Sequence, residues 1–238
     1  METKIEQFLT LVNNSDNIVF FGGAGVSTES GIHDFRSKDG LYTLKYKVPP
    51  EEILSHSFFI RHTDEFYKFY KDKINPLKYQ PNITHIKLAE LERMGKLKAV
   101  ITQNIDGLHQ RAGSSTVYEL HGSVLRNYCM NCGKFYDAQY VFGCKGIPKC
   151  SCGGIIKPDV VLYQEGLDQG TLANSIKAIQ NANLLIIAGT SLTVQPASSL
   201  ITYFRGNNLV LINKTSTLYD YAASLVIHDT LGNVFGTL

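Results

Sequence analysis

Five short runs of apolar residues constrain the fold most, because none of them alternates apolar with polar side chains. They cover residues 18–21, 99–101, 160–163, 184–187 and 209–212. A strand with one wet face alternates, whereas a strand covered on both faces reads as a continuous apolar run. Weaker runs at residues 116–118 and 225–227 bring the predicted sheet to about seven strands.

Helical patterns separate these runs. Apolar residues recur at i, i+3, i+4 and i+7 from Ile5 and again from Ala197, where Pro196 suits the first turn. Further helices are predicted over residues 84–94 and 172–181. Strands alternating with helices indicate an α/β fold with a doubly wound, mainly parallel, Rossmann-like sheet.

Two stretches interrupt the alternation. Residues 37–81 hold no predicted strand but include an aromatic-rich helical segment over 58–73, and residues 126–157 hold every cysteine. We expect these two insertions to form a smaller module beside a large domain of residues 1–36, 82–125 and 158–238. Ligands commonly bind in the cleft between two such parts.

A glycine-rich loop, residues 22–31, follows the first predicted strand directly. Small residues at such a turn let the backbone approach a pyrophosphate. The spacing is not G-x-G-x-x-G, because counting from Gly23 and Gly25 puts Thr28 where a third glycine would fall. A tight turn without a ligand therefore explains the loop alone about as well as nucleotide binding does.

Polar side chains follow the strand over residues 99–101. Gln103, Asn104 and Asp106 come at its carboxyl end, where ligand crevices of parallel sheets open. By themselves they are explained more simply as caps of the next helix. His121 follows another predicted strand, and a histidine that titrates near neutrality suits a general base, although most histidines are structural.

The five cysteines all lie between residues 129 and 152. Cys129 and Cys132 form a C-x-x-C pair, and Cys150 and Cys152 follow as C-x-C after 17 intervening residues. Four thiolates satisfy tetrahedral zinc and leave no open position for water, which predicts a structural metal rather than a hydrolytic one. Cys144 is the spare and could replace Cys150. The alternative is a set of reduced thiols without metal.

Charge and hydropathy exclude several classes of protein. The 23 Lys and Arg residues against 21 Asp and Glu give a net charge of +2, too balanced for binding nucleic acid by bulk charge. No apolar run approaches the roughly 18 residues of a membrane span. The first residues lack the pattern of a secretory signal, so we expect a cytoplasmic protein with no membrane or nucleic-acid partner.

Several segments together resemble the sirtuins, which are NAD-consuming protein-lysine deacylases. The matching segments are GAGVSTESGIHDFR from residue 23, TQNIDGLHQRAG from residue 102, ELHGS from residue 119, KPDVVLYQE from residue 157, GTSL from residue 189 and INK from residue 212. The resemblance implies that His121 is the catalytic base, with Asn104 and Asp106 holding the nicotinamide ribose and amide. It also implies that Val161 contacts the substrate lysine.

The same resemblance implies a set of cofactor-binding residues. NAD is the implied co-substrate, beside one structural zinc held by Cys129, Cys132, Cys150 and Cys152. The implied NAD-binding residues are Gly23, Ala24, Gly25, Thr28, Asp34, Phe35, Arg36, Gln103, Asn104, Ile105, Asp106, Gly189, Thr190, Ser191, Asn213 and Asp229.

The implied function is NAD-dependent removal of acetyl groups from protein lysines, with acetylated proteins or peptides as partners and nicotinamide and O-acetyl-ADP-ribose as products. Relatives that remove acidic acyl groups carry Tyr and Arg three residues apart. Here Tyr70 stands three after Tyr67, which predicts a neutral acyl group. Two alternatives remain open: a protein ADP-ribosyltransferase and a non-catalytic NAD sensor.

Overall fold

Nine strands form two separate sheets in the computed structural model, which describes residues 2–34 and 48–238. The larger sheet has six strands in the order β3-β2-β1-β7-β8-β9, and every neighbouring pair in it is parallel. Its strands are β1 (Ile18–Gly22), β2 (Leu97–Thr102), β3 (Val117–Glu119), β7 (Leu184–Ala188), β8 (Asn208–Ile212) and β9 (Leu225–Ile227). The mainly parallel sheet is therefore confirmed.

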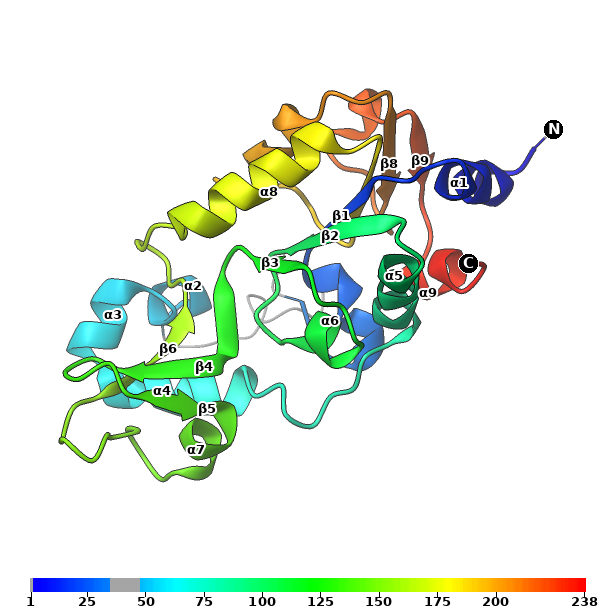
Figure 1. The fold of residues 1–238 in the computed structure, drawn as a ribbon. Helices are drawn as coiled ribbons and strands as arrows, with labels where there is room; N and C mark the ends of the chain where they lie inside the picture. Colours follow the sequence, from blue (N-terminus) through cyan, green and yellow to red (C-terminus); the bar gives the residue numbers. More distant parts are fainter. Residues whose placement is uncertain (1, 35–47) are drawn as a thin grey trace.

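Helices cover both faces of this sheet (Figure 1). Ile18 and Phe20 pack into the core beneath helices α1 (Lys4–Asn13), α5 (Ile83–Arg93) and α9 (Leu231–Phe235). Val19 and Phe21 point to the other face, beneath α8 (Gln169–Asn181) and the 3₁₀ helix η4 (Ala197–Tyr203). Two-sided burial explains why the strands carry no polar alternation.

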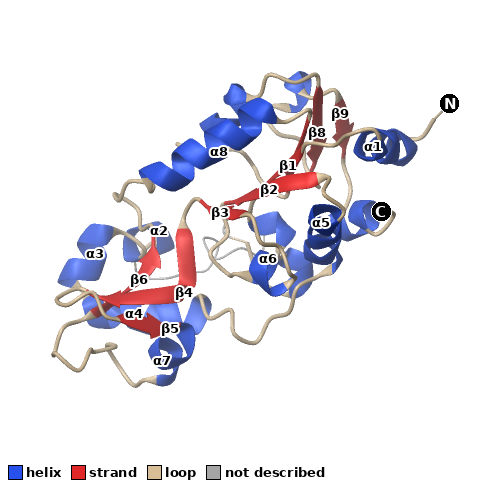
Figure 2. Ribbon diagram, viewed as in Figure 1, coloured by secondary structure: helices blue, strands red, loops and turns tan. Residues whose placement is uncertain are grey.

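A smaller module lies beside the sheet domain (Figure 2). Its antiparallel sheet has the order β5-β4-β6. Its core joins residues of the helical insertion, such as Phe59 and Tyr67, to residues of the cysteine-bearing stretch 126–157, such as Val141 and Ile156. Its elements are α2 (Pro50–Ile53), α3 (His56–Arg61), α4 (Thr63–Lys73), β4 (Gly122–Cys129), β5 (Phe135–Asp137), α7 (Ala138–Gly143) and β6 (Ile156–Val160).

One strand was predicted in the wrong sheet. Residues 160–163 were expected to return the chain into the parallel sheet, but β6 ends at Val160 and pairs with β4 in the small module. Tyr163 forms an isolated β-bridge with Ser55 of the helical insertion. An apolar run records burial on both sides and not which sheet supplies the partner strand. The small sheet also extends beyond residues 126–157, because it begins at Gly122 and ends at Val160.

Two helix predictions also need correction. The helical segment over residues 58–73 is two helices, α3 and α4, with His62 between them in a non-helical conformation. The helix from Ala197 is a 3₁₀ helix, and Pro196 precedes it instead of lying in its first turn. Within the described residues, no helix is both long and apolar enough to cross a membrane.

Candidate active site

The carboxyl ends of the parallel strands place most of the predicted polar residues along one edge of the sheet. The strand order reverses direction at β1, which has β2 on one side and β7 on the other. Ligands of doubly wound sheets bind outside the carboxyl ends at such a switch point. The loops that follow β1, β2 and β7 therefore form the candidate site.

The glycines of the first loop pack against the loop after β7. The Gly25 N–H donates to the carbonyl of Gly189 at 2.8 Å. A Cβ on Gly25 would lie 2.7 Å from the Gly189 Cα, and a Cβ on Gly23 would lie 2.7 Å from the Thr190 Cβ. Because no side chain fits at that distance, these glycines allow two loops of the site to touch.

Three side chains from the β1 and β2 loops form a hydrogen-bonded group. The Ser27 hydroxyl donates to Asp106 Oδ2 at 2.7 Å, and Asn104 Nδ2 donates to the Ser27 Oγ at 3.1 Å. The second carboxylate oxygen of Asp106 accepts the Leu108 N–H at 2.9 Å. The structure thus brings Asn104 and Asp106 together, and Ser27 joins them.

Asp106 is a buried carboxyl group, with 7% of its surface exposed. Burial is the main cause that raises its pKa, with a smaller contribution from the Glu119 carboxylate, while the hydrogen bonds from Leu108 and Ser27 oppose the rise. Sequence reasoning did not single out Ser27. Its position within the glycine-rich loop was the available signal, but only the fold aims its hydroxyl at Asp106.

His121 is anchored through one ring nitrogen. Its Nδ1 lies 2.8 Å from the Gln103 carbonyl oxygen, which can only accept, so Nδ1 carries the proton and donates. The Gln103 side chain in turn donates from Nε2 to the Thr190 hydroxyl at 3.1 Å. In the neutral ring, Nε2 is then the nitrogen that can take up a proton.

The surroundings of His121 favour its neutral form. Burial lowers the pKa of His121, and the hydrogen bond to Gln103 opposes this shift. The His121 carbonyl accepts the Val161 N–H at 3.0 Å. The predicted substrate-contact residue therefore lies directly beside the predicted base.

Asn82 braces the glycine-rich loop from outside. Its Nδ2 donates to the Val26 carbonyl at 2.8 Å and to the Ser30 hydroxyl at 3.0 Å. Its Oδ1 accepts the N–H groups of Thr84 and His85 and so caps α5. Sequence reasoning placed a helix here but missed the cap and its contact with the loop.

The remaining predicted residues lie at several places along the same edge. Ala24, Thr28 and Asp34 belong to the first loop or follow it, Ile105 packs against the core of the small module, and Ser191 is exposed. Phe35 and Arg36 fall outside the described residues.

Asn213 and Asp229 follow β8 and β9, farther along the edge. The Asn213 side chain donates to the Thr215 carbonyl at 3.0 Å. Asp229 Oδ1 accepts the Thr230 N–H at 2.6 Å and the Asn233 Nδ2 at 2.9 Å. Neither contact joins the group formed by Ser27, Asn104 and Asp106.

Four cysteines of the small module meet at one point. The sulfurs of Cys129, Cys132, Cys150 and Cys152 all lie within 4.8 Å of one another. The closest approaches are 3.5 Å from Cys129 to Cys152, 3.5 Å from Cys132 to Cys152 and 3.6 Å from Cys132 to Cys150. Zinc–sulfur bonds of about 2.3 Å in a tetrahedron separate the sulfurs by roughly 3.8 Å, so the four thiols fit a zinc ion.

Cys144 is not part of this cluster, so the alternative in which it replaces Cys150 is wrong. Its sulfur lies 3.2 Å from the Lys71 ammonium and 3.3 Å from the Val141 carbonyl. Gly154 is required beside the cluster, because a Cβ there would lie 2.7 Å from the Cys129 sulfur. The four ligands complete the coordination, which makes the site structural.

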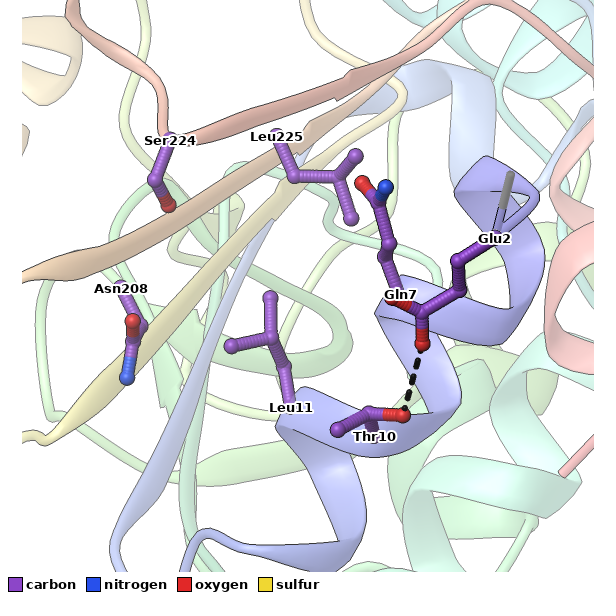
Figure 3. A pocket seen from close by; sticks show the side chains of 7 residues that line it. All are labelled: Glu2, Gln7, Thr10, Leu11, Asn208, Ser224 and Leu225. Carbon is purple, nitrogen blue, oxygen red and sulfur yellow. Dashed lines mark hydrogen bonds between the residues drawn. The ribbon is translucent and has the colours of Figure 1, made fainter.

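A surface hollow lies at the opposite edge of the large sheet (Figure 3). It is bounded by α1 and by Asn208 and Leu225, the first residues of β8 and β9. Within it, the Thr10 hydroxyl donates to Glu2 Oε1 at 3.3 Å. Of the predicted site residues that the structure describes, none lines this hollow.

The fold and the site together define a class: nucleotide-binding α/β proteins with a cysteine-ligated metal module beside the switch point of the sheet. The chain belongs to the Sir2 family, whose model matches residues 23–196. The resemblance of its motifs to the sirtuins is thereby confirmed.

Proteins named NAD-dependent protein deacetylase are similar over nearly the whole chain. One from Clostridium perfringens is 59% identical, covering 99% of this chain and 98% of its own. Another, from Clostridium acetobutylicum, is 57% identical with the same coverage. A solved Sir2 structure with deacetylated p53 peptide and 3'-O-acetyl-ADP-ribose is 38% identical, with a TM-score of 0.90 over 98% of this chain and 96% of that chain. A Sir2 structure with p53 peptide and NAD⁺ is 39% identical, with a TM-score of 0.88 over 99% and 97%.

Proposed function

We propose that this protein removes acetyl groups from lysine side chains of proteins, using NAD⁺ as co-substrate and giving nicotinamide and O-acetyl-ADP-ribose. The observation that carries the proposal is the anchoring of His121 through Nδ1 to the Gln103 carbonyl at 2.8 Å. It leaves Nε2 to accept a proton at the edge of the sheet where Asn104 and Asp106 lie. The names and bound molecules of the similar proteins agree with this reaction.

His121 is the proposed general base. NAD⁺ supplies, when bound, the ribose carbon that accepts the acetyl oxygen as nicotinamide leaves. His121 Nε2 then takes a proton from a ribose hydroxyl, which lets that oxygen attack the acyl carbon. Burial keeps the imidazole neutral near pH 7 and so keeps it able to accept this proton.

Asn104 and Asp106 are proposed to orient the nicotinamide riboside. An amide and a carboxylate offer hydrogen bonds to ribose hydroxyls and to the nicotinamide carboxamide. Ser27, which contacts both of them, adds a hydroxyl to the same group. The other proposed NAD-binding residues follow the carboxyl ends of the strands. They are Gly23, Ala24, Gly25, Thr28, Asp34, Phe35, Arg36, Gln103, Ile105, Gly189, Thr190, Ser191, Asn213 and Asp229.

The substrate peptide is proposed to lie along the segment after β6. Val161 lies there, and its N–H donates a hydrogen bond to the His121 carbonyl at 3.0 Å. The Val161 side chain is the proposed contact for the lysine alkyl chain. An extended peptide can add to such a segment as a strand.

A neutral acyl group is the proposed preference. The Tyr67 hydroxyl is buried and donates to the Ile156 carbonyl, so it is not directed at a ligand. The Lys71 ammonium donates to the carbonyls of Cys144 at 2.6 Å and Gly146 at 2.7 Å. A faster reaction on a succinylated peptide than on its acetylated twin would contradict this preference.

The deciding experiment is mass spectrometry of an acetyl-lysine peptide incubated with the zinc-loaded protein, with and without NAD⁺. We expect loss of the acetyl group only with NAD⁺, together with O-acetyl-ADP-ribose, and no loss with His121→Ala. ADP-ribose attached to protein would instead indicate a transferase. NAD⁺ that is bound but not consumed would indicate a sensor.

We also propose that the enzyme acts in the cytoplasm without nucleic-acid partners. The balanced net charge of +2 supports the lack of nucleic-acid partners. From the sequence we place the large domain at residues 1–36, 82–125 and 158–238 and the small module at 37–81 and 126–157, whereas the strands of the small sheet begin at Gly122 and end at Val160. Truncation at these boundaries, followed by a test for cooperative unfolding, checks them.

A further inference from the structure

The turn that carries His121 is also a direct connection between the two sheets. β3 of the large sheet ends at Glu119 and β4 of the small sheet begins at Gly122, so only two residues separate them (Figure 1). Leu120 is tied back to the large sheet by its N–H, which donates to the Thr102 carbonyl at 2.9 Å. A change in the angle between the sheets would therefore alter the backbone beside His121.

Arg126 spans this connection with its guanidinium group. Its Nη1 donates to Glu119 Oε2 at 2.6 Å, and its Nε donates to Asp159 Oδ2 at 2.8 Å. Arg126 lies on β4, Glu119 on β3 and Asp159 on β6. One side chain thus joins β3, the strand before His121, to β6, which pairs with β4 in the small sheet.

The backbone at Asp159 is in direct contact with the start of β4. Asp159 pairs with Ser123 in the antiparallel register. A Cβ on Gly122 would lie only 2.0 Å from the Asp159 carbonyl oxygen. A shift of Asp159 must therefore move Gly122, the residue that follows His121.

We propose that Arg126 is a positioning residue for His121, which it holds in register by bridging Glu119 and Asp159. The proposal rests on the deacetylase function proposed above. Arg126 acts through the two strands to which its guanidinium is hydrogen-bonded, β3 at Glu119 and β6 at Asp159. The planar guanidinium can donate to two carboxylates from two fixed nitrogens, whereas a lysine offers a single point charge.

Stability alone does not account for this arrangement. The side chains of Arg126 and Asp159 are 39% and 44% exposed, and ion pairs of that exposure add little stability. The Glu119 side chain is only 8% exposed, so its carboxylate has little contact with water besides accepting the hydrogen bond from Arg126. Losing Arg126 therefore leaves the buried Glu119 carboxylate without this partner, which disturbs the turn that carries His121 and also lowers stability.

The kinetic test compares Arg126→Met with Arg126→Lys. We expect Arg126→Met to lower kcat about tenfold with KM for NAD⁺ changed less than about twofold, because misplacing a reacting group costs rate rather than ground-state binding. Arg126→Lys should recover part of kcat. Lys87→Met, which removes a surface pair with Glu90 on α5, is the matched control and should leave kcat unchanged.

A second measurement does not depend on turnover. The ¹⁵N NMR shifts of the imidazoles, assigned with His121→Ala, report which ring nitrogen carries the proton. We expect one Nδ1-protonated form of His121 in the unaltered protein and in Lys87→Met, and a mixture of forms in Arg126→Met. An unchanged ring signal together with an unchanged kcat in Arg126→Met overturns the proposal, whatever happens to the melting temperature.

The two measurements separate this inference from the proposed function. If the unaltered protein does not deacetylate, the proposed function fails, and the NMR comparison still decides whether Arg126 positions His121. If the unaltered protein deacetylates and Arg126→Met has the same NMR signature and the same kcat, the proposed function stands and the positioning role is wrong.

Discussion

At the scale of single residues, Gly122 occupies a position that no side chain can share. Its φ is +72°, and a Cβ would meet the Asp159 carbonyl oxygen at 2.0 Å. Gly95, at the end of α5, has almost the same φ of +73° but nothing within 4 Å of a Cβ. A comparison of substitutions at these two glycines therefore separates the energetic cost of backbone strain from that of a steric clash.

Gly122→Ala should destabilise the fold by roughly 3 kcal/mol, against about 1 kcal/mol for Gly95→Ala, which carries only the cost of the left-handed conformation. Urea unfolding of both variants measures the difference. Gly122→Ala should also lower kcat, because His121 is the preceding residue. Equal losses of stability in the two variants would show that the close approach to Asp159 is not a real constraint.

A pair of buried histidines predicts sensitivity to acid. The rings of His85 and His109 lie 4.7 Å apart between their centroids. Burial lowers the pKa of His85 to about 4, and burial together with the neighbouring His85 lowers the pKa of His109 well below its usual value. The unfolded chain, with histidine pKa values near 6.5, binds more protons than the folded chain below that pH, so folding weakens as pH falls.

The free energy of unfolding should therefore fall between about pH 6.5 and pH 4, with His85 contributing on the order of 3 kcal/mol. The measurement is a series of urea unfolding curves across this range. His85→Gln should show a shallower dependence on pH than the unaltered protein, since it lacks one titrating group. Identical slopes would contradict the assignment.

At the scale of elements, Asn82 does two tasks at the start of α5. It caps the helix, and it holds the glycine-rich loop through Val26 and Ser30. Thr3 caps α1 with a similar capping box but does not contact the site. Each substitution to alanine should cost about 1 kcal/mol of stability through the lost cap.

Only Asn82→Ala should also raise KM for NAD⁺, by about fivefold, because the loop loses two hydrogen bonds. Steady-state kinetics and thermal unfolding of Asn82→Ala and Thr3→Ala test the distinction. A KM that stays the same in both variants would show that α5 does not position the loop.

The spacing of apolar residues along the chain also determines which helices and strands could be predicted from the sequence. The strands of the large sheet were recognisable because both their faces are buried, and α1 because Phe8 and Val12 fall on one helical face. The break at His62 and the 3₁₀ form of η4 were not predicted. Both depend on how the segment packs against its neighbours rather than on its own periodicity.

At the scale of the whole molecule, the cysteine cluster stabilises the small module rather than the large domain. Cys129 and Cys150 belong to the core of the small module, which also contains Phe59 and Tyr67 of the helical insertion. Metal binding and folding are coupled in such small modules. Loss of zinc should therefore disorder the small module before the large sheet.

Cys132→Ser should remove bound zinc and lower deacetylation at least about tenfold, because the small module helps to form the site. Metal content by mass spectrometry and turnover of an acetylated peptide measure both effects. Cys144→Ser is the matched control and should keep its zinc, since Cys144 lies outside the cluster. Retention of zinc by Cys132→Ser would contradict the ligand assignment.

The sequence by itself determined the class of sheet, the loops that carry the polar residues and the four clustered cysteines, because apolar runs, helical spacing and paired cysteines are local signals. The tertiary structure decided what depends on distant partners. It placed β6 in the small sheet, excluded Cys144 from the cluster and set Ser27 against Asp106. It also joined Glu119 to Asp159 through Arg126. No local pattern specifies these contacts, because strand pairing and side-chain contact between remote segments arise only when the whole chain packs.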